Sequence, residues 1–355
     1  MPLHIHLFTL DFNMIKKIII RLLFLLLIVV ASILVYNKFI WPIDRYMHAD
    51  LLDALDKNRD SAAIIYIGES SNFWNAKEEH DKRSISEMIA ENLEFPLLTL
   101  NKSAYHLGIY KPLFKHINKR KNVKHVVLTI NLRTFGPPCV HGEFETSLQK
   151  DALFLSNQVP IVKKLKAVFN MYDNQSADDR NKVLWQHWTK DTLNLNGTTL
   201  KFVNVKNWCA VDKFMDSNNI EDMPKRVLAD HYIKAFGFNL NAKNERVKDL
   251  DAIVALAEKQ HYQLYLLIMS ENIHWADSLA GKDLGNLIRT NRDYLVKRYQ
   301  SSNHVQIIDN LETVKSAYFG EKDWTTEHYY WQGRKQIADS VSQVIKRNVV
   351  INKQQ

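Results

Sequence analysis

The fold of this chain is decided by residues 62–72, which read AAIIYIGESSN. Residues 62–67 are almost all apolar, and Gly68 separates them from the polar run Glu69-Ser70-Ser71-Asn72. A short apolar run of this kind is typical of a strand in a parallel sheet that is covered on both faces. The polar residues after it are expected at the carboxyl edge of the sheet, where open α/β sheets bind their ligands.

Strand and helix patterns alternate on both sides of this segment. Helices are predicted at 84–93, 109–118, 244–260, 284–299 and 333–347, and strands at 62–67, 97–100, 123–131, 262–269 and 305–308. The alternation predicts an α/β fold, namely a doubly wound, mostly parallel sheet of about five strands in a flavodoxin-like three-layer arrangement. We expect this domain to span residues 61–347 and to leave a frayed tail at 348–355.

The alternation is interrupted between about residues 136 and 241, where no βα repeat is visible. The pattern there favours amphipathic helices at Leu148–Ser156, Val162–Met171 and Asn181–Leu193. We therefore predict a mainly helical insertion over the sheet. Its tryptophans, Trp185, Trp188 and Trp208, fit core positions better than a ligand platform.

The N-terminal region contains a long apolar segment at residues 18–41. About 20 apolar residues span a bilayer, so this segment is long enough to be a transmembrane anchor. Lys16, Lys17 and Arg21 precede or begin it, and no clean cleavage site follows, which favours an uncleaved signal anchor over a removed signal peptide. A juxtamembrane helix is expected at 42–60. Residues 1–17 would form a short cytoplasmic tail, although Met14 is an alternative start.

The positive-inside rule predicts a single-pass protein of the cell membrane, with a cytoplasmic N-terminus and a domain on the extracytoplasmic, periplasmic side. The chain has 355 residues and a formal charge of +8 that is spread along it. No basic face interleaved with stacking aromatics is visible, so a nucleic-acid partner is not expected. An anionic glycan or a membrane surface is the more natural partner.

Two cysteines, Cys139 and Cys209, could form a disulfide in an oxidising compartment or remain as two buried thiols. The sequence leaves both alternatives open. Neither lies in a metal-ligand pattern, and no nucleotide-binding glycine motif is present. We therefore predict neither a metal nor a cofactor.

Three residues from distant segments are candidates for acyl-transfer chemistry. Ser70 follows the first predicted strand, Asn131 ends the third, and His328 precedes the last helix. A serine nucleophile, an amide that donates to an oxyanion and a histidine base are the parts that this chemistry needs. Each residue also has a structural alternative, as a helix cap, a turn residue or a loop histidine.

Other residues are weaker candidates at the same edge. Gly68 would allow a close approach of backbone, and a backbone N–H near Ser103 could complete an oxyanion hole. Arg133 could bind a substrate carboxylate or phosphate, although a surface salt bridge is the commoner role. Asn272 follows the fourth predicted strand and reaches the same rim.

These segments resemble the SGNH/GDSL hydrolase-like superfamily. Gly68-Glu69-Ser70 corresponds to its Gly-Asp-Ser block, Ser103 lies near its second block, Asn131 matches its third, and His328 with Gly333 matches its last. The resemblance covers roughly residues 60–135 and 245–347. It implies an α/β hydrolase fold and a serine acyl-ester mechanism. The membrane segment before such a domain resembles extracytoplasmic proteins that add or remove acyl groups on envelope polymers.

The chain departs from the superfamily pattern at two positions. Glu69 replaces an aspartate that supports the turn, and Thr325 replaces the aspartate that orients the histidine. Asp323, Glu327 or a backbone carbonyl could orient His328 instead, and Asp323 is the preferred candidate.

Two functions follow as hypotheses from these residues. The first is a serine-dependent acyl-ester hydrolase or O-acyltransferase that acts on a cell-envelope glycan or another small acylated ester, with a membrane acyl-donor protein as a possible partner. The second is a catalytically silent binding or assembly module for polymer export.

Overall fold

The computed structural model describes residues 12–354, with gaps at 59–61, 94, 118–122, 143–144, 156–175, 196, 212–213, 216–217, 219, 322 and 326. Its centre is a five-stranded sheet in the order β2-β1-β3-β4-β5, in which every neighbouring pair is parallel. The strands are β1 (Ile64–Gly68), β2 (Leu97–Asn101), β3 (His125–Ile130), β4 (Gln263–Ile268) and β5 (Val305–Asp309). The predicted flavodoxin-like α/β fold is confirmed.

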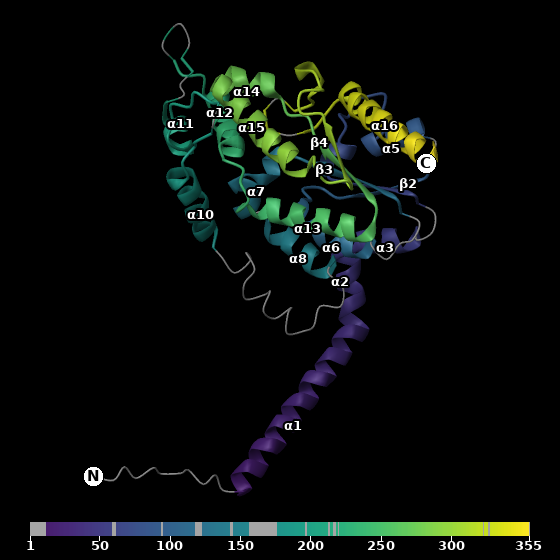
Figure 1. The fold of residues 1–355 in the computed structure, drawn as a ribbon. Coiled ribbons are helices and arrows are strands. Elements are labelled where there is room, and N and C mark those ends of the chain that lie inside the picture. Colours follow the sequence, from purple (N-terminus) through teal and green to yellow (C-terminus); the bar gives the residue numbers. More distant parts are fainter. Residues whose placement is uncertain are drawn as a thin grey trace, which may run out of the picture.

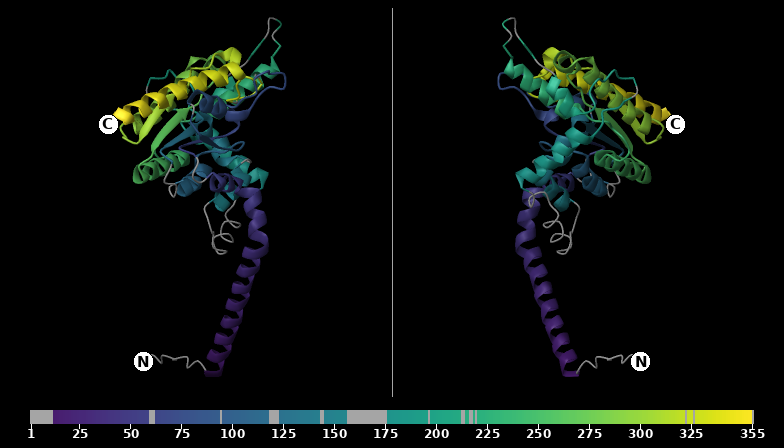
Figure 2. Two further views of the ribbon diagram at one scale, coloured as in Figure 1. Left: turned by 90° about the vertical axis from the view of Figure 1, so that its right-hand side faces the viewer. Right: turned by 90° about the vertical axis from the view of Figure 1, so that its left-hand side faces the viewer.

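Alternate residues along each strand face two different hydrophobic cores, because side chains point to opposite faces of a sheet. In β1, Ile65 and Ile67 join the larger core, whereas Ile64 and Tyr66 join the smaller one. The larger core contains α6 (Leu107–Ile117), α13 (Glu245–Gln260) and α15 (Lys282–Tyr299). The smaller core contains α5 (Ile85–Leu93) and α16 (Trp331–Gln354), which lie side by side over the other face (Figures 1 and 2).

Local sequence signals set several of these helix ends. Ser84 and Glu87 form a reciprocal capping box before α5, with Glu87 accepting from the Ser84 N–H at 2.7 Å. Asn244 caps α13 by accepting from the N–H groups of Arg246 and Val247. The last helix continues to Gln354, so the tail expected from residue 348 is helical to that point.

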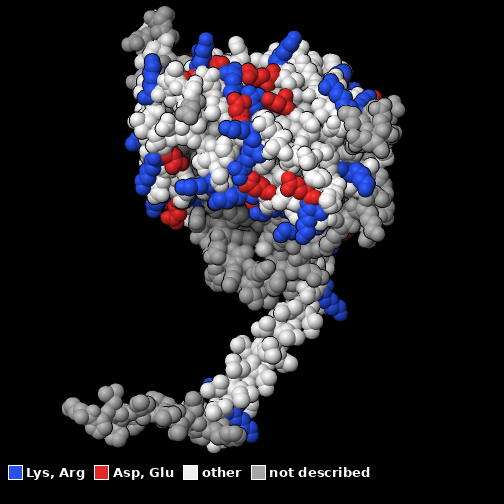
Figure 3. Space-filling view, in the orientation of Figure 1, with Lys and Arg blue, Asp and Glu red and all other residues white. Residues whose placement is uncertain are grey.

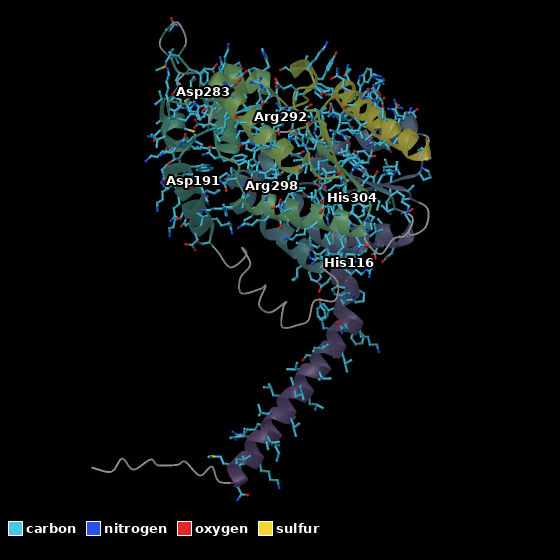
Figure 4. All side chains as sticks on the ribbon, in the orientation of Figure 1. His116, Asp191, Asp283, Arg292, Arg298 and His304 are labelled. Atoms are coloured by element: carbon cyan, nitrogen blue, oxygen red, sulfur yellow. The ribbon has the colours of Figure 1, made fainter. Side chains whose placement is uncertain are left out.

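The packing of α15 fixes one side of the sheet. Arg298 forms a two-pronged ion pair with Asp251 of α13, both contacts being 2.8 Å, and Arg292 pairs with Asp309 at the end of β5. Figure 4 shows both arginines on α15, at the front of the domain. These contacts hold α15 between α13 and the carboxyl end of β5.

Between β3 and α13 the described residues form helices and loops rather than βα units. The helices are η2 (Leu132–Phe135), α7 (Pro137–His141), α8 (Glu145–Leu155), α10 (Ala177–Lys190), α11 (Val205–Val211) and α12 (Met223–Phe236). The predicted helical insertion is therefore confirmed. The helix expected at Val162–Met171 lies outside the described residues. Trp208 is buried in the core, but Trp185 is half exposed.

The N-terminal segment forms a long helix that projects from the domain (Figure 1). It comprises α1 (Phe12–Val35), the π-helical turn η1 (Tyr36–Ile40) and α2 (Trp41–His48), and it is long and apolar enough to cross a membrane. Figure 3 shows the projecting helical segment as largely uncharged, with basic residues near its N-terminal end and again close to the domain, where Lys38 lies in η1.

The predicted juxtamembrane helix is broken at Ala49, between α2 and α3 (Asp50–Lys57). His48 contacts Asp151 of α8 at 2.7 Å, which attaches the end of α2 to the domain.

Candidate active site

The candidate site lies at the carboxyl edge of the sheet, beside the point where chain connections diverge. Strand β2 lies on one side of β1, and the chain reaches it through α5. Strand β3 lies on the other side of β1, and the chain reaches it from β2 through α6. Because α5 and α6 cover opposite faces, a crevice is expected where β1 and β3 end. Ser70 follows β1 and Asn131 follows β3, so both residues lie at this crevice.

Ser70 and His328 meet although 258 positions separate them. Ser70 is the first residue of α4 (Ser70–Phe73), and its Oγ lies 3.0 Å from Nε2 of His328. This is hydrogen-bond distance between a serine and a potential general base. The serine, amide and histidine proposed from the sequence are thus placed at one edge of the sheet.

Glu69 both caps α4 and contacts the serine hydroxyl. Its Oε1 accepts from the Ser71 N–H at 3.0 Å, and its Oε2 lies 2.7 Å from Ser70 Oγ. A serine hydroxyl has one proton, so it can donate to Glu69 or to His328 but not to both. The residue expected only to support the turn therefore also competes with the histidine for the serine proton.

The carboxylate beside His328 comes from Glu321 rather than from Asp323. Oε2 of Glu321 lies 3.0 Å from Nδ1 of His328, whereas no contact joins Asp323 to that ring among the described residues. The contact has the distance of an ion pair but not the direction of a hydrogen bond. Glu327, the second candidate from the sequence, points to Arg133 instead.

A short antiparallel bridge brings Glu321 to the histidine. Phe319 pairs with Tyr329, and the Gly320 N–H donates to the His328 carbonyl at 2.8 Å. Glu321, the residue after Gly320, is therefore held beside the ring. Sequence spacing alone pointed to positions nearer the histidine, because the superfamily motif places its carboxylate three residues away.

The imidazole of His328 is also held by an aromatic stack. Trp74 lies parallel to it, with ring centroids 5.1 Å apart and planes at 8°. Behind Trp74, the buried guanidinium of Arg334 donates to the carbonyls of Trp74, Asp81 and Arg83. Arg334 thus ties the loop after α4 to the last helix, and this loop supplies the surface on which His328 rests.

Asn131 and Arg133 contact carboxylates at the carboxyl edge of the sheet. Nδ2 of Asn131 donates to Glu69 at 2.8 Å and lies 3.4 Å from Glu327. Arg133 donates two hydrogen bonds to the Glu327 carboxylate, from Nε at 3.1 Å and from Nη2 at 2.8 Å. In this arrangement the Asn131 amide hydrogens are taken up by carboxylates rather than directed into an open oxyanion site.

The pKa values of the two buried carboxyl groups next to Arg133, those of Glu327 and Glu271, are shifted in opposite directions. Burial opposes ionisation of Glu327, but the Arg133 charge and its hydrogen bonds outweigh burial and lower the Glu327 pKa. Burial, and then repulsion by Glu327, raises the pKa of Glu271 well above its usual value. Burial and the neighbouring Glu327 thus favour the protonated form of Glu271, whereas Arg133 favours the ionised form of Glu327.

The remaining candidates have mainly structural contacts. A Cβ at Gly68 would lie 2.7 Å from the Tyr66 ring, so the strand needs glycine there. Ser103 lies in an exposed turn after β2, whose last residue Asn101 pairs with Gly68. Asn272 caps α14 (Ile273–Ala280) by accepting from the Trp275 N–H. Their substrate-binding roles remain predictions.

The structure contains no disulfide between Cys139 and Cys209. Within the described part of the chain, no group of three histidine, cysteine or carboxylate side chains is placed to hold a metal ion.

Comparisons with known proteins give no family assignment. No family model matches the chain, and no curated protein matches it. Among solved structures, the chain is similar to a lipase from a goat rumen metagenome, with 12% identity and a TM-score of 0.32. The match covers 79% of this chain and 96% of the lipase.

Two further similar structures come from named bacteria. A proposed platelet-activating factor from Streptococcus pneumoniae has 10% identity and a TM-score of 0.37. The match covers 89% of this chain and 98% of that protein's chain. A proposed acylhydrolase from Bacteroides fragilis has 11% identity and TM-score 0.35, covering 84% and 97%.

Proposed function

We propose that this chain is a membrane-anchored serine enzyme that cleaves acyl esters. The observation that carries the proposal is the 3.0 Å contact between Ser70 Oγ and His328 Nε2 at the carboxyl edge of the sheet. In this proposal Ser70 is the nucleophile, His328 the general base, and Glu321 the residue that orients the imidazole.

The reaction proceeds in two half-reactions. Ser70 Oγ bonds to the carbonyl carbon of the ester while its proton passes to Nε2 of His328. That proton then goes to the departing alkoxide, and the acyl group remains on Ser70. Water or a second hydroxyl then attacks the acyl carbon and gives its proton to Nε2 of His328. The bond between the acyl group and Ser70 Oγ breaks, and His328 returns the proton to Oγ, which restores the serine.

The oxyanion formed in each half-reaction needs hydrogen-bond donors. The backbone N–H of Ser70 at the start of α4 and an N–H near Ser103 are the donors that we propose. Asn131 can join them only if its amide leaves Glu69 or Glu327 when substrate binds.

The proposed substrate is an acylated glycan of the cell envelope. The α1 to α2 segment would hold the domain at the membrane, with the N-terminus in the cytoplasm and the site outside. Transfer of the acyl group to a glycan hydroxyl, from a membrane acyl-donor protein, differs from hydrolysis only in the second half-reaction.

The test is esterase activity of the full-length protein in detergent with p-nitrophenyl acetate. We expect Ser70→Ala and His328→Ala each to lower kcat by a factor on the order of 10³ or more. Ser71→Ala is the matched control, because Ser71 is the buried residue after Ser70 and its Oγ has no hydrogen-bond partner among the described residues. It should retain activity. A fluorophosphonate should label Ser70 in the wild type and leave Ser70→Ala unlabelled.

A catalytically silent binding module is the second candidate. It is favoured by one observation, that the Asn131 amide and the Ser70 hydroxyl are both bonded to Glu69. Folded wild-type protein that neither hydrolyses the ester nor reacts with the fluorophosphonate would support this candidate and contradict the enzyme.

A further inference from the structure

A second feature of the crevice region is a pocket of about 480 Å³ beside the Arg133–Glu327 ion pair. Its walls come from the segment after β3, from α10 and α12, and from the loop that precedes His328. Cationic side chains line it, namely Arg133, Arg180 and Lys234, and none of the described residues that line it is an aspartate or a glutamate. A concave site lined by cations is suited to an anion.

Among the described residues, two polar atoms of the pocket lining are buried and have no hydrogen-bond partner. They are Nε1 of Trp188 and Nδ1 of His231. The indole N–H can only donate, and a buried donor without an acceptor is unfavourable.

Two of these cations, Lys234 and Arg133, keep hydrogen-bonding capacity toward the pocket. Lys234 lies 3.8 Å from Asp230, which is a long ion pair, and its Nζ is 5.6 Å from the centre of the Trp188 ring. Arg133 uses Nε and Nη2 for Glu327, while its side chain is still 24% exposed where it lines the pocket. An anion placed here would therefore meet donors from two sides.

Aromatic surface completes the lining. Trp324 is 49% exposed, and its ring meets the edge of His231 with centroids 4.1 Å apart. Trp188 contributes the second indole. Flat apolar surfaces beside a few directed polar groups favour a ligand with both an apolar face and polar substituents.

We propose that this pocket binds an anionic sugar unit of the substrate, with its carboxylate or phosphate at Lys234 and Arg133 and its ring against the tryptophans. The inference rests on the proposed function, because it names the substrate class of the same site. Ser70 and His328 do not line the pocket, so the bound sugar would lie away from the ester that reacts.

One loop connects the pocket to the candidate catalytic residues. Trp324 and Thr325 line the pocket, and they lie between Glu321, which contacts His328, and Glu327, which pairs with Arg133. A sugar bound against Trp324 would thus contact the loop that positions the histidine.

The test is calorimetric titration of the full-length protein in detergent with D-glucuronate, D-glucose 6-phosphate and D-glucose. At least one anionic sugar should bind roughly tenfold or more tightly than glucose, since charge-assisted hydrogen bonds are lost with the neutral sugar. The tighter of the two anions identifies the recognised group as carboxylate or phosphate. Lys234→Gln should weaken that binding by about tenfold.

Lys225→Gln is the matched control, because Lys225 lies on the same helix, stacks over Phe214 and does not line the pocket. It should bind the anionic sugar like the wild type. Ser70→Ala should also bind normally, so that a failure of binding is distinguished from a failure of catalysis.

Three results would overturn the inference. They are equal binding of glucose and the anionic sugars, wild-type affinity in Lys234→Gln, and no saturable binding of any sugar. Hexanoate that binds more tightly than both anionic sugars, with the same dependence on Lys234, would equally overturn it by showing an acyl-chain site.

Discussion

Glu321 Oε2 lies 3.0 Å from His328 Nδ1 because the backbone pairing of Gly320 with His328 brings the two segments together. A carboxylate at this nitrogen favours the tautomer in which Nε2 can accept the serine proton. In the proposed mechanism, Glu321 takes the place of the aspartate that the superfamily motif has at the position of Thr325.

The first prediction separates Glu321 from Asp323. Glu321→Gln should lower kcat with p-nitrophenyl acetate by a factor on the order of 10 to 100, less than for a buried triad carboxylate because the Glu321 side chain is 36% exposed. Asp323→Asn removes the same charge two residues away and should change kcat less than about twofold. A larger loss in Asp323→Asn than in Glu321→Gln would reverse the assignment.

The second prediction concerns the stack of Trp74 on His328. A Cβ at Gly320 would lie 2.1 Å from Cη2 of Trp74, so Gly320→Ala should displace the indole and with it the imidazole. We expect kcat to fall by roughly tenfold or more. Phenylalanine lacks the outer ring atoms that the Cβ would meet.

The double variant Gly320→Ala/Trp74→Phe should therefore be more active than Gly320→Ala alone, with Trp74→Phe as the reference. Losses that simply add would mean that the indole does not transmit the effect.

The third prediction concerns the buried ion pair of Arg133 with Glu327. Arg133→Met leaves the Glu327 carboxylate uncompensated, and it should lower the free energy of unfolding by about 3 to 5 kcal/mol. The double variant Arg133→Met/Glu327→Leu removes both charges and should be more stable than Arg133→Met. Denaturant unfolding in detergent measures the difference, and a double variant less stable than the single one would contradict this account.

The fourth prediction is a pH dependence of stability from Glu271. Burial raises its pKa in the folded chain, so between its unfolded value of about 4.5 and its folded value the folded state holds one more proton than the unfolded state. The contribution of Glu271 to the free energy of unfolding is therefore fully present at low pH. It decreases as pH rises, by up to about 1.4 kcal/mol per pH unit.

Glu271→Gln should remove this slope. The thermal midpoint of the variant should therefore rise relative to that of the wild type as pH is raised from 6 to about 8. Glu312→Gln is the control. The hydrogen bonds and charge of Arg289 lower the Glu312 pKa, so its contribution to stability changes only as pH falls below its unfolded value. Parallel midpoints for Glu271→Gln and wild type would show that Glu271 is ionised in the fold.

The local sequence predicted the sheet and its order of elements. Apolar runs such as 62–67 and 262–269 can only be buried, and helical patterns between them leave a parallel sheet as the consistent arrangement. The same logic placed Ser70 and Asn131 at one edge, because the carboxyl ends of parallel strands share that edge, and His328 was expected on a loop near it. The apolar N-terminal helix was equally visible, since its length and composition are properties of a continuous segment.

Tertiary structure decided which groups these residues contact. Glu321 and Trp74 were not singled out by the sequence, because a bridge and a ring stack depend on segments that are distant in the chain. The signal for Glu321 was only a carboxylate seven residues before the histidine, a spacing that no regular element brings together. Sequence patterns record the periodicity of single segments, whereas hydrogen bonds and ion pairs depend on where separate segments meet in three dimensions.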